Sequence, residues 1–229
     1  MSKIVLGFSG GVDSAVSTML LKKAGHEVYG LYMDNADEAA RQCAIDTAEF
    51  IGVPLTVLDV KAELERNVCR PFTDAYLRGE TPNPCILCNP SVKFKYLIDH
   101  ADQIGAKWVA TGHYARAKDG ALYKGMPSND QSYMLCRLRR DQVARLILPL
   151  GEYEKARVRE MAAEFGIPVA NKPDSMERGG PGKKKDVSMG QIREEMGFDA
   201  DSSSDDNSEK PSVPSSNSDQ SASDSTSSN

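Results

Sequence analysis

Two short stretches of the 229-residue chain place reactive residue types at close spacing, and the first is residues 9–14 (SGGVDS). Two glycines allow a tight turn whose N–H groups face an anion, and a side chain at Gly10 or Gly11 would occupy the space of phosphate oxygens. Ser14 falls at the start of the next expected helix, where unpaired N–H groups favour phosphate. The spacing matches neither a Walker A loop nor GxGxxG. It predicts a phosphate-binding loop, with a serine-capped glycine turn as the alternative.

The second stretch is residues 81–89, which read TPNPCILCN. Its prolines stiffen the backbone, so we expect a loop held in one shape. Cys85 and Cys88 form a CxxC pair, which alone indicates a redox pair, half of a metal site, or chance. Neither a second CxxC nor HxxxH follows, so a complete zinc site is not expected.

The elements that must position these stretches alternate between strand and helix. Apolar runs rich in β-formers predict strands at residues 3–8, 27–33, 55–59 and 108–111. Helical spacing occurs at residues 15–24, 37–51, 92–104 and 154–165. A β-hairpin is expected around Asp119 and Gly120. Buried strands joined by helices predict an α/β fold, a Rossmann-like parallel sheet with right-handed crossovers.

Charge is distributed unevenly although the net charge is only −5. Residues 91–160 hold 13 basic and eight acidic residues, which suits contacts to nucleic-acid phosphates or an ordinary solvated face. Residues 201–229 hold 13 serines and almost no apolar residues, which predicts a disordered C-terminal tail. We therefore expect one domain over residues 1–178. Residues 179–229 would supply a basic loop, a segment able to form one short helix, and the tail.

Several classes of protein are excluded by composition. Five cysteines show no disulfide framework, the N-terminus resembles neither a signal nor a transit peptide, and no apolar run approaches ~18 residues. These features predict a cytoplasmic protein with reduced thiols and no membrane partner. Cys43, Cys69 and Cys136 are expected to be small buried core residues. Among the histidines, His113 is the one placed to lie near a site.

Five short stretches form an ordered set that is more informative than any one of them alone. They are SGGVDS, TPNPCILCN, ATGHYAR at 110–116, DQSY at 130–133 and LPLG at 148–151. Over residues 1–175 the chain resembles the tRNA-specific 2-thiouridylases, which place sulfur on the wobble uridine of certain tRNAs. Its first loop resembles the PP-loop of ATP pyrophosphatases. The resemblance implies an adenine nucleotide alpha hydrolase-like sheet with ATP across the carboxyl ends of the strands.

The resemblance also implies roles for particular residues. ATP would be bound by Gly7, Phe8, Ser9, Gly10, Gly11, Val12, Asp13, Ser14, Met33 and Gly112. The target base would meet Asn83, Pro84 and Cys85, and other parts of tRNA would meet Asn129, Asp130 and Gln131. Cys88 would be the catalytic cysteine, with Cys85 as its partner. Because only a thiolate reacts, nearby positive charge should lower the pKa of Cys88.

The implied reaction begins with adenylation of uridine O2 by ATP and Mg²⁺, which releases pyrophosphate. Sulfur bound to a cysteine then attacks the activated carbon, and AMP leaves. The implied partners are tRNA and a sulfur donor, either a cysteine desulfurase or a sulfur-relay protein.

The chain departs from the family's pattern in two respects. The family has a second catalytic cysteine soon after an Asp-Ser pair, whereas here Met176 follows Asp174-Ser175 and no cysteine follows Cys136. The family's central and β-barrel domains are not matched. Cys85 stands where some members carry Asp.

Several alternatives therefore stay open. Cys85 and Cys88 form a persulfide–resolving pair, or they supply two ligands to an iron–sulfur cluster, which needs further thiolates. The chain is a thiolase, a partner-dependent half of one, or a non-catalytic remnant that binds ATP or tRNA. An amide-forming ligase on the same loop is disfavoured, because it would not require TPNPCILCN.

Overall fold

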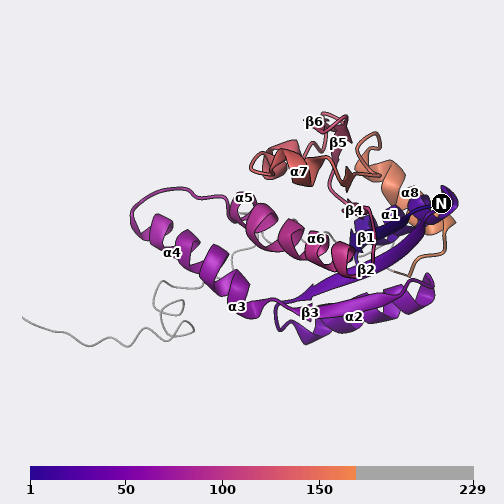
Figure 1. The fold of residues 1–229 in the computed structure, drawn as a ribbon, viewed down its shortest axis with the longest axis horizontal. Coiled ribbons are helices and arrows are strands. Elements are labelled where there is room, and N and C mark those ends of the chain that lie inside the picture. The colour runs from indigo at the N-terminus through magenta and orange to yellow at the C-terminus, as the bar shows by residue number, and fades with distance from the viewer. Residues whose placement is uncertain (169–229) are drawn as a thin grey trace, which may run out of the picture. The chain divides into compact units, whose positions relative to one another are not determined.

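The computed structural model describes residues 1–168, shown as the coloured ribbon of Figure 1. The expected domain boundary at residue 178, the basic loop, the short helix and the disordered tail all lie outside the described residues. Within them, no helix combines the length and the apolar character that crossing a bilayer requires.

A five-stranded parallel sheet forms the centre of the fold; the sequence predicts a parallel sheet and four of its strands, but not the fifth, at residues 146–147. Its strands are β1 (Lys3–Gly7), β2 (Glu27–Asp34), β3 (Leu55–Asp59), β4 (Trp108–Ala110) and β7 (Leu146–Ile147). All neighbours are parallel and the order is β3-β2-β1-β4-β7. The chain therefore proceeds outward from β1 in one direction and then from β4 in the other. The carboxyl ends of β1 and β4 form the topological switch point where such sheets bind ligands.

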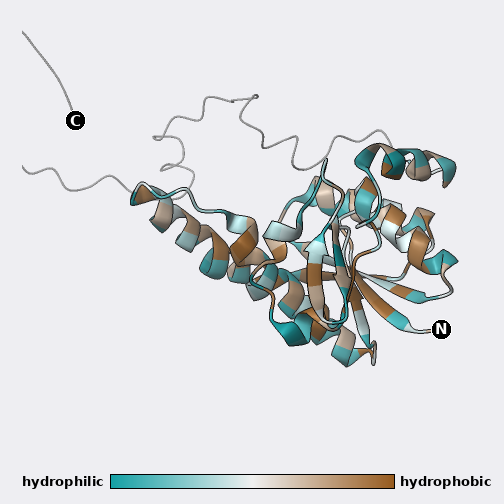
Figure 2. Ribbon diagram, turned by 90° about the horizontal axis from the view of Figure 1, so that it is seen from above, coloured by the Kyte–Doolittle hydropathy of each residue, from teal (hydrophilic) through white to brown (hydrophobic). Residues whose placement is uncertain are grey.

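The two faces of the sheet are covered by different elements. Ile4 and Leu6 of β1 join one buried cluster, whereas Val5 joins another, because successive strand side chains alternate between faces. The first cluster contains residues of α1 (Val12–Lys23), α2 (Glu38–Phe50) and α8 (Lys155–Glu164). The second contains residues of α6 (Phe94–Gln103) and of β5 (Ala115–Lys118). Figure 2 shows the hydrophobic residues concentrated in the central strands.

The predicted hairpin is also present. β5 pairs in antiparallel fashion with β6 (Ala121–Lys124). Asp119 and Gly120 between them have φ angles of 52° and 73°, the positive values that a two-residue hairpin turn requires. After the hairpin come the 3₁₀ turn η3 (Ser132–Leu135) and α7 (Arg140–Val143).

Helices also project beyond the sheet, in two successive segments (Figure 1). The first segment is α3 (Lys61–Leu64), the π-helical η1 (Glu65–Cys69) and α4 (Arg70–Leu77). The second segment is α5 (Pro84–Cys88) and the π-helical η2 (Asn89–Lys93), which lead into α6.

The prediction of a rigid loop at residues 81–89 is wrong, because its second half is α5. Pro84 occupies the first turn, where a helix needs no N–H from it, and the Asn83 side chain accepts a hydrogen bond from the Cys85 N–H at 3.0 Å. Pro90 lies in the π-helical turn η2, where wider winding relieves the clash that proline causes inside an α-helix. Of the two prolines that suggested a loop, Pro84 therefore starts a helix, and Pro90, just beyond the stretch, lies in a widened turn.

Candidate functional site

Residues 9–14, here called the phosphate loop, connect β1 to α1 at the switch point. Gly10 has a φ of +71°, and a Cβ added to it would lie 2.5 Å from Ala44 Cα on α2. Thr47 of α2 also donates its hydroxyl to the Gly10 carbonyl at 3.3 Å. The expectation that Gly10 leaves room for phosphate is therefore wrong, since its missing side chain makes room for α2. At Gly11 an added Cβ would meet only Ser9 Oγ, at 3.5 Å, so this position is open.

Two serines form hydrogen bonds within the phosphate loop. Ser14 Oγ accepts from the Ser9 N–H at 3.3 Å, donates to the Gly11 carbonyl at 3.0 Å and lies 3.2 Å from Ser9 Oγ. The N-cap residue of α1 is Gly11, and no side chain caps the helix, so the alternative of a serine-capped turn does not hold. The first N–H groups of α1 have no helical acceptor, and together with the helix dipole they favour an anion.

A carboxylate, an ammonium and a phenol meet beside the loop. Lys155 Nζ at the start of α8 lies 2.7 Å from both carboxylate oxygens of Asp13, and the Tyr114 hydroxyl donates to Asp13 Oδ1 at 2.7 Å. The ammonium also lies over the Tyr114 ring, 5.4 Å from its centroid. Sequence reasoning missed Lys155, which is 142 residues from its partner; the nearby LPLG stretch was the available signal.

The segment after β4 lies against the phosphate loop, as expected for Gly112. A Cβ at Gly112 would lie 3.0 Å from Asp13 Cβ, so glycine permits this close approach. Next to it, Thr111 Oγ1 and His113 Nδ1 share a hydrogen bond of 2.7 Å, and the His113 ring stacks on Phe94. Burial, with a smaller contribution from the Lys93 ammonium, lowers the pKa of His113 to about 3, so its ring is neutral at neutral pH.

Some of the other residues expected to bind ATP offer only backbone groups to a nucleotide. Phe8 and Val12 have side chains in the core, so only their backbone groups can face a nucleotide. Met33 lies near the carboxyl end of β2 and packs on the buried cluster of Val60, Val68 and Val92. Cys88 packs on that same cluster. This cluster thus connects Cys88 to the carboxyl end of β2.

The two thiols of α5, here called the cysteine helix, differ in exposure. Cys85 is exposed, whereas Cys88 is half-buried. Burial raises the pKa of the Cys88 thiol; the ammonium and backbone N–H of Lys93 oppose this rise without reversing it. The expectation of a lowered pKa for Cys88 is therefore wrong, although the expected positive charge is present.

The remaining cysteines also differ from expectation. Cys43 and Cys69 are only half-buried and Cys136 is exposed, so none is a fully buried core residue. Cys69, on η1, has a pKa raised by burial and by Glu65.

Residues 129–131, expected to contact tRNA, mostly bind their own chain. Asp130 accepts hydrogen bonds from the Gly125 N–H at 2.7 Å and from both the N–H and hydroxyl of Ser132. Burial opposes ionisation of Asp130, yet these bonds hold its pKa below the ordinary value. Gln131 pairs with the Tyr114 backbone through its own N–H and side chain. Asn129 is different, because its buried Nδ2 has no hydrogen-bond partner.

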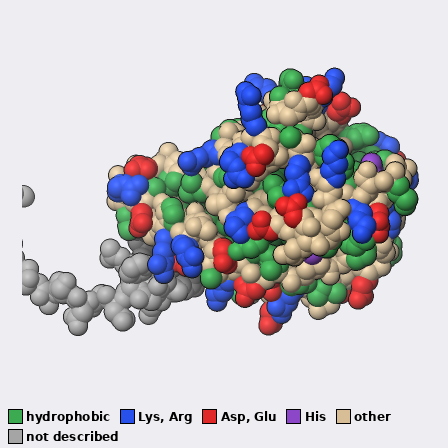
Figure 3. All heavy atoms as spheres, viewed as in Figure 1, with side chains coloured by type: hydrophobic (Ala, Val, Ile, Leu, Met, Phe, Trp, Pro, Cys, Tyr) green, Lys and Arg blue, Asp and Glu red, His purple; other side chains and the backbone are tan. Residues whose placement is uncertain are grey.

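Exposed cations gather on the hairpin and on the segment before and within α7. Here called the basic surface, they are Arg116, Lys118, Lys124, Arg137, Arg139 and Arg140. Asp141 pairs with Arg139, and Asp119 occupies the hairpin turn. Figure 3 shows Lys and Arg side chains on the upper protrusion of the molecule, with a few acidic neighbours.

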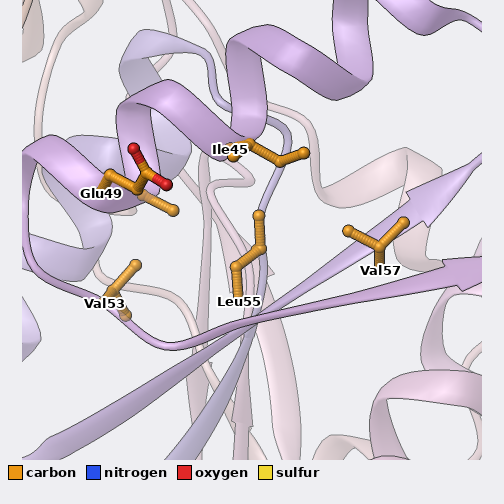
Figure 4. Close-up of a pocket in the computed structure, with 6 residues that line it drawn as sticks. Ile45, Glu49, Val53, Leu55 and Val57 are labelled. Carbon is orange, nitrogen blue, oxygen red and sulfur yellow. The ribbon is translucent and has the colours of Figure 1, made fainter.

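Two other features of the described residues offer less chemistry. Within residues 1–168 no group of three or more His, Cys, Asp or Glu side chains is arranged to hold a metal, so the iron–sulfur hypothesis gains no support. A pocket of about 320 Å³ lies between α2 and β3 (Figure 4). Its lining is apolar except for Glu49, and it contains no nucleophile.

The fold and the phosphate loop define a Rossmann-like α/β domain of the PP-loop type. Over residues 2–178 the chain matches the family described as tRNA methyl transferase HUP domain, and it belongs to that family. The resemblance inferred from the five motifs is thereby confirmed.

Curated relatives carry the name tRNA-specific 2-thiouridylase MnmA. The protein of Cupriavidus taiwanensis is 44% identical over 189 residues, which cover 76% of this chain and 52% of that protein. The protein of Ralstonia nicotianae is 44% identical over 188 residues, covering 76% and 51%. This chain therefore spans about half the length of the curated relatives it matches.

Solved structures support the fold. NMN synthetase from Francisella tularensis superposes with a TM-score of 0.51 at 21% identity, covering 85% of this chain and 71% of that one. A 4-thiouridine synthetase in complex with RNA and bound ATP has a TM-score of 0.50 at 19% identity, with coverages of 75% and 43%. At these identities the likeness concerns the fold alone.

Proposed function

We propose that this chain carries out the ATP-dependent 2-thiolation of the wobble uridine of tRNA. The observation that carries the proposal is the joint placement of Met33 and Cys88. Both pack on the cluster of Val60, Val68 and Val92, beside the carboxyl end of β2 and next to the switch point. The reactive thiol and the nucleotide site would therefore lie at the same edge of the sheet. Kinship with proteins named 2-thiouridylase agrees with this pairing.

ATP would place its phosphates on the phosphate loop and the uncapped start of α1. Ser9 and Ser14 hold the turn, and Gly11 leaves its outer side open. Lys155 forms an ion pair with Asp13 of the loop and would exchange this carboxylate for phosphate oxygens when the nucleotide binds. This exchange would neutralise charge that develops on the leaving pyrophosphate.

The residues present fit an Mg²⁺ ion carried by the nucleotide rather than a separate protein site. Such ions take phosphate oxygens, waters and one or two carboxylates, and Asp13 is the carboxylate beside the loop. Bound there, the ion would supply further charge neutralisation at the phosphates.

Uridine O2 would attack the α-phosphate of ATP, and pyrophosphate would leave. The activated C2 would then accept sulfur from the cysteine helix, with AMP as the second leaving group. Asn83, Pro84 and Cys85 stand at the exposed start of α5, where a base flipped from its stack would be received. The side-chain Oδ1 of Asn83 accepts a hydrogen bond from the Cys85 N–H, so we assign the base contact of Asn83 to its side-chain amide nitrogen.

The basic surface would hold tRNA phosphates. Asn129, whose side-chain Nδ2 has no hydrogen-bond partner, lies between β6 and η3 in the same segment. Asp130 and Gln131 would act indirectly, by fixing the shape of this segment. The sulfur donor would be a protein that carries a persulfide, either a cysteine desulfurase or a relay protein.

ATP–pyrophosphate exchange, measured with and without tRNA, tests this function. We expect exchange only with tRNA, and a loss of at least about tenfold in Lys155→Met, because a charge-assisted contact is removed. Arg157→Met is the matched control, since Arg157 on the same helix pairs with Glu160 and Glu164 instead. Absence of exchange would favour a binding remnant or a partner-dependent half. Exchange that ignores tRNA would favour a ligase.

A further inference from the structure

We propose that the two thiols of the cysteine helix act in a fixed order: Cys85 receives sulfur from the donor, and Cys88 resolves the intermediate. The inference rests on the proposed function and deepens it. It reverses the roles that the sequence suggests, in which Cys88 is the reactive cysteine and Cys85 assists.

Exposure separates the two thiols. Cys85 is exposed, at the second residue of α5, where a persulfide on another protein can reach it. Cys88 is half-buried and packs on the cluster of Val60, Val68 and Val92. A protein-borne persulfide needs an accessible thiol, because sulfur transfer passes through contact between the two sulfur atoms. Accessibility therefore favours Cys85 as the point of entry.

The electrostatic surroundings of Cys88 agree with a later role. Burial raises its pKa, Cys69 and Cys85 raise it further, and only Lys93 on η2 acts in the opposite direction. At neutral pH Cys88 is therefore mostly a thiol and a slow nucleophile toward a donor in solution. An attack within the same helix needs far less reactivity, because the partner sulfur is already held nearby.

The helical form of residues 84–88 makes the pair possible. Residues three apart on a helix share one side, with about 5–6 Å between their Cβ atoms. A disulfide needs about 3.5–4.5 Å, so the first turn must tighten. The Cys85 N–H is held by the Asn83 side chain rather than by a helical carbonyl, so a movement of this N–H breaks no helical main-chain bond, whereas the Cys85 carbonyl still accepts from the Asn89 N–H.

Sulfur transfer proceeds in three steps, and none of them requires an oxidant. The Cys85 thiolate attacks the outer sulfur of the donor persulfide, forming a Cys85 persulfide and releasing the donor thiol. The terminal sulfur attacks C2 of the adenylated uridine, and AMP leaves. The Cys88 thiolate then attacks Cys85 Sγ, which breaks the sulfur–sulfur bond and releases 2-thiouridine. The sulfur is reduced, the two cysteines become a disulfide, and a dithiol reductant restores them.

Persulfide mapping tests the order of the thiols. The full chain, reduced beforehand, is exposed briefly to limiting cysteine persulfide, alkylated and examined by peptide mass spectrometry. We expect sulfur on Cys85, an unchanged labelling rate in Cys88→Ser, and a rate at least tenfold lower in Cys85→Ser. Cys136→Ser is the matched control, because Cys136 is also exposed but lies outside the helix. Loss of labelling in Cys88→Ser, or equal labelling of Cys85 and Cys136, would overturn the proposal.

The resolving step has its own readout. After a single turnover with ATP and tRNA but no reductant, we expect a Cys85–Cys88 disulfide in the wild type. In Cys88→Ser we expect tRNA trapped on Cys85. A Cys69–Cys88 disulfide would assign resolution to η1 and contradict the proposal. The labelling experiment needs neither ATP nor tRNA, so it can fail while tRNA-dependent exchange succeeds, and the reverse also holds.

Discussion

The phosphate loop is held by packed backbone, whereas the cysteine helix presents one of its two thiols to solvent. At the loop, the backbone of Ala44 on α2 occupies the space where a Gly10 side chain would lie. Asp13 forms an ion pair with Lys155 on α8. The cysteine helix is held at its C-terminal end by a side-chain hydrogen bond. There the side-chain amide of Asn89 donates to the Met134 carbonyl at 2.8 Å.

The difference agrees with the proposed roles of the two regions. A phosphate is recognised by N–H groups that must already point in the right direction, so a loop fixed by close packing loses little freedom on binding. A thiol that exchanges sulfur with another protein must remain reachable, which close packing would prevent. The proposed function thus combines a rigid loop for phosphate with one exposed and one half-buried thiol.

The largest effect should come from filling the space at Gly10. Gly10→Val places a Cβ against the α2 backbone and forces a β-branched residue into a left-handed conformation. We expect a loss of at least about 3 kcal/mol in the free energy of unfolding. Gly11→Val is the matched control: it should keep the melting temperature within a few degrees and weaken ATP binding in calorimetric titration. Equal stability of the two variants would show that α2 does not fix the loop.

The sequence predicts the region of regular packing better than the region of irregular backbone. The parallel sheet, the hairpin and the phosphate loop were all predictable, because strand periodicity and glycine spacing are local signals. The cysteine helix was not, because Pro82 and Pro84 indicate a stiff loop rather than a helix. Whether a proline starts a helix or widens a π-helical turn depends on what packs around it. Lys155 was missed for a related reason, since its contact with Asp13 spans the whole domain.

A second, smaller effect should come from releasing the cysteine helix. Asn89→Ala leaves the buried Met134 carbonyl without its donor, which should cost about 1–3 kcal/mol. Asn83→Ala, which removes a more exposed helix cap, should cost about 1 kcal/mol or less. Urea unfolding of both variants gives the comparison. Hydrogen exchange should then show faster exchange at residues 84–93 in Asn89→Ala, while residues 9–14 stay protected. Joint loosening of both regions would show that they are one unit.

His113 lies where the two regions meet, because it follows β4, bonds to Thr111 and stacks on Phe94 of the helix that continues from the cysteine helix. Its pKa is about 3 in the folded protein, against about 6.5 in an unfolded chain. The unfolded state therefore binds the proton first, so this residue lowers stability progressively as the pH falls from about 6.5 toward 3 and contributes nothing above that window.

At pH 5 this linkage should remove about 1–2 kcal/mol relative to pH 7.5, allowing for partial solvent access. His113→Gln cannot take up the proton, so its loss of stability between the two pH values should be smaller by that amount. Urea unfolding at the two pH values measures the difference. Equal losses in wild type and variant would mean that the imidazole reaches water in the folded state. The junction would then be open, and the phosphate loop and the cysteine helix would move independently.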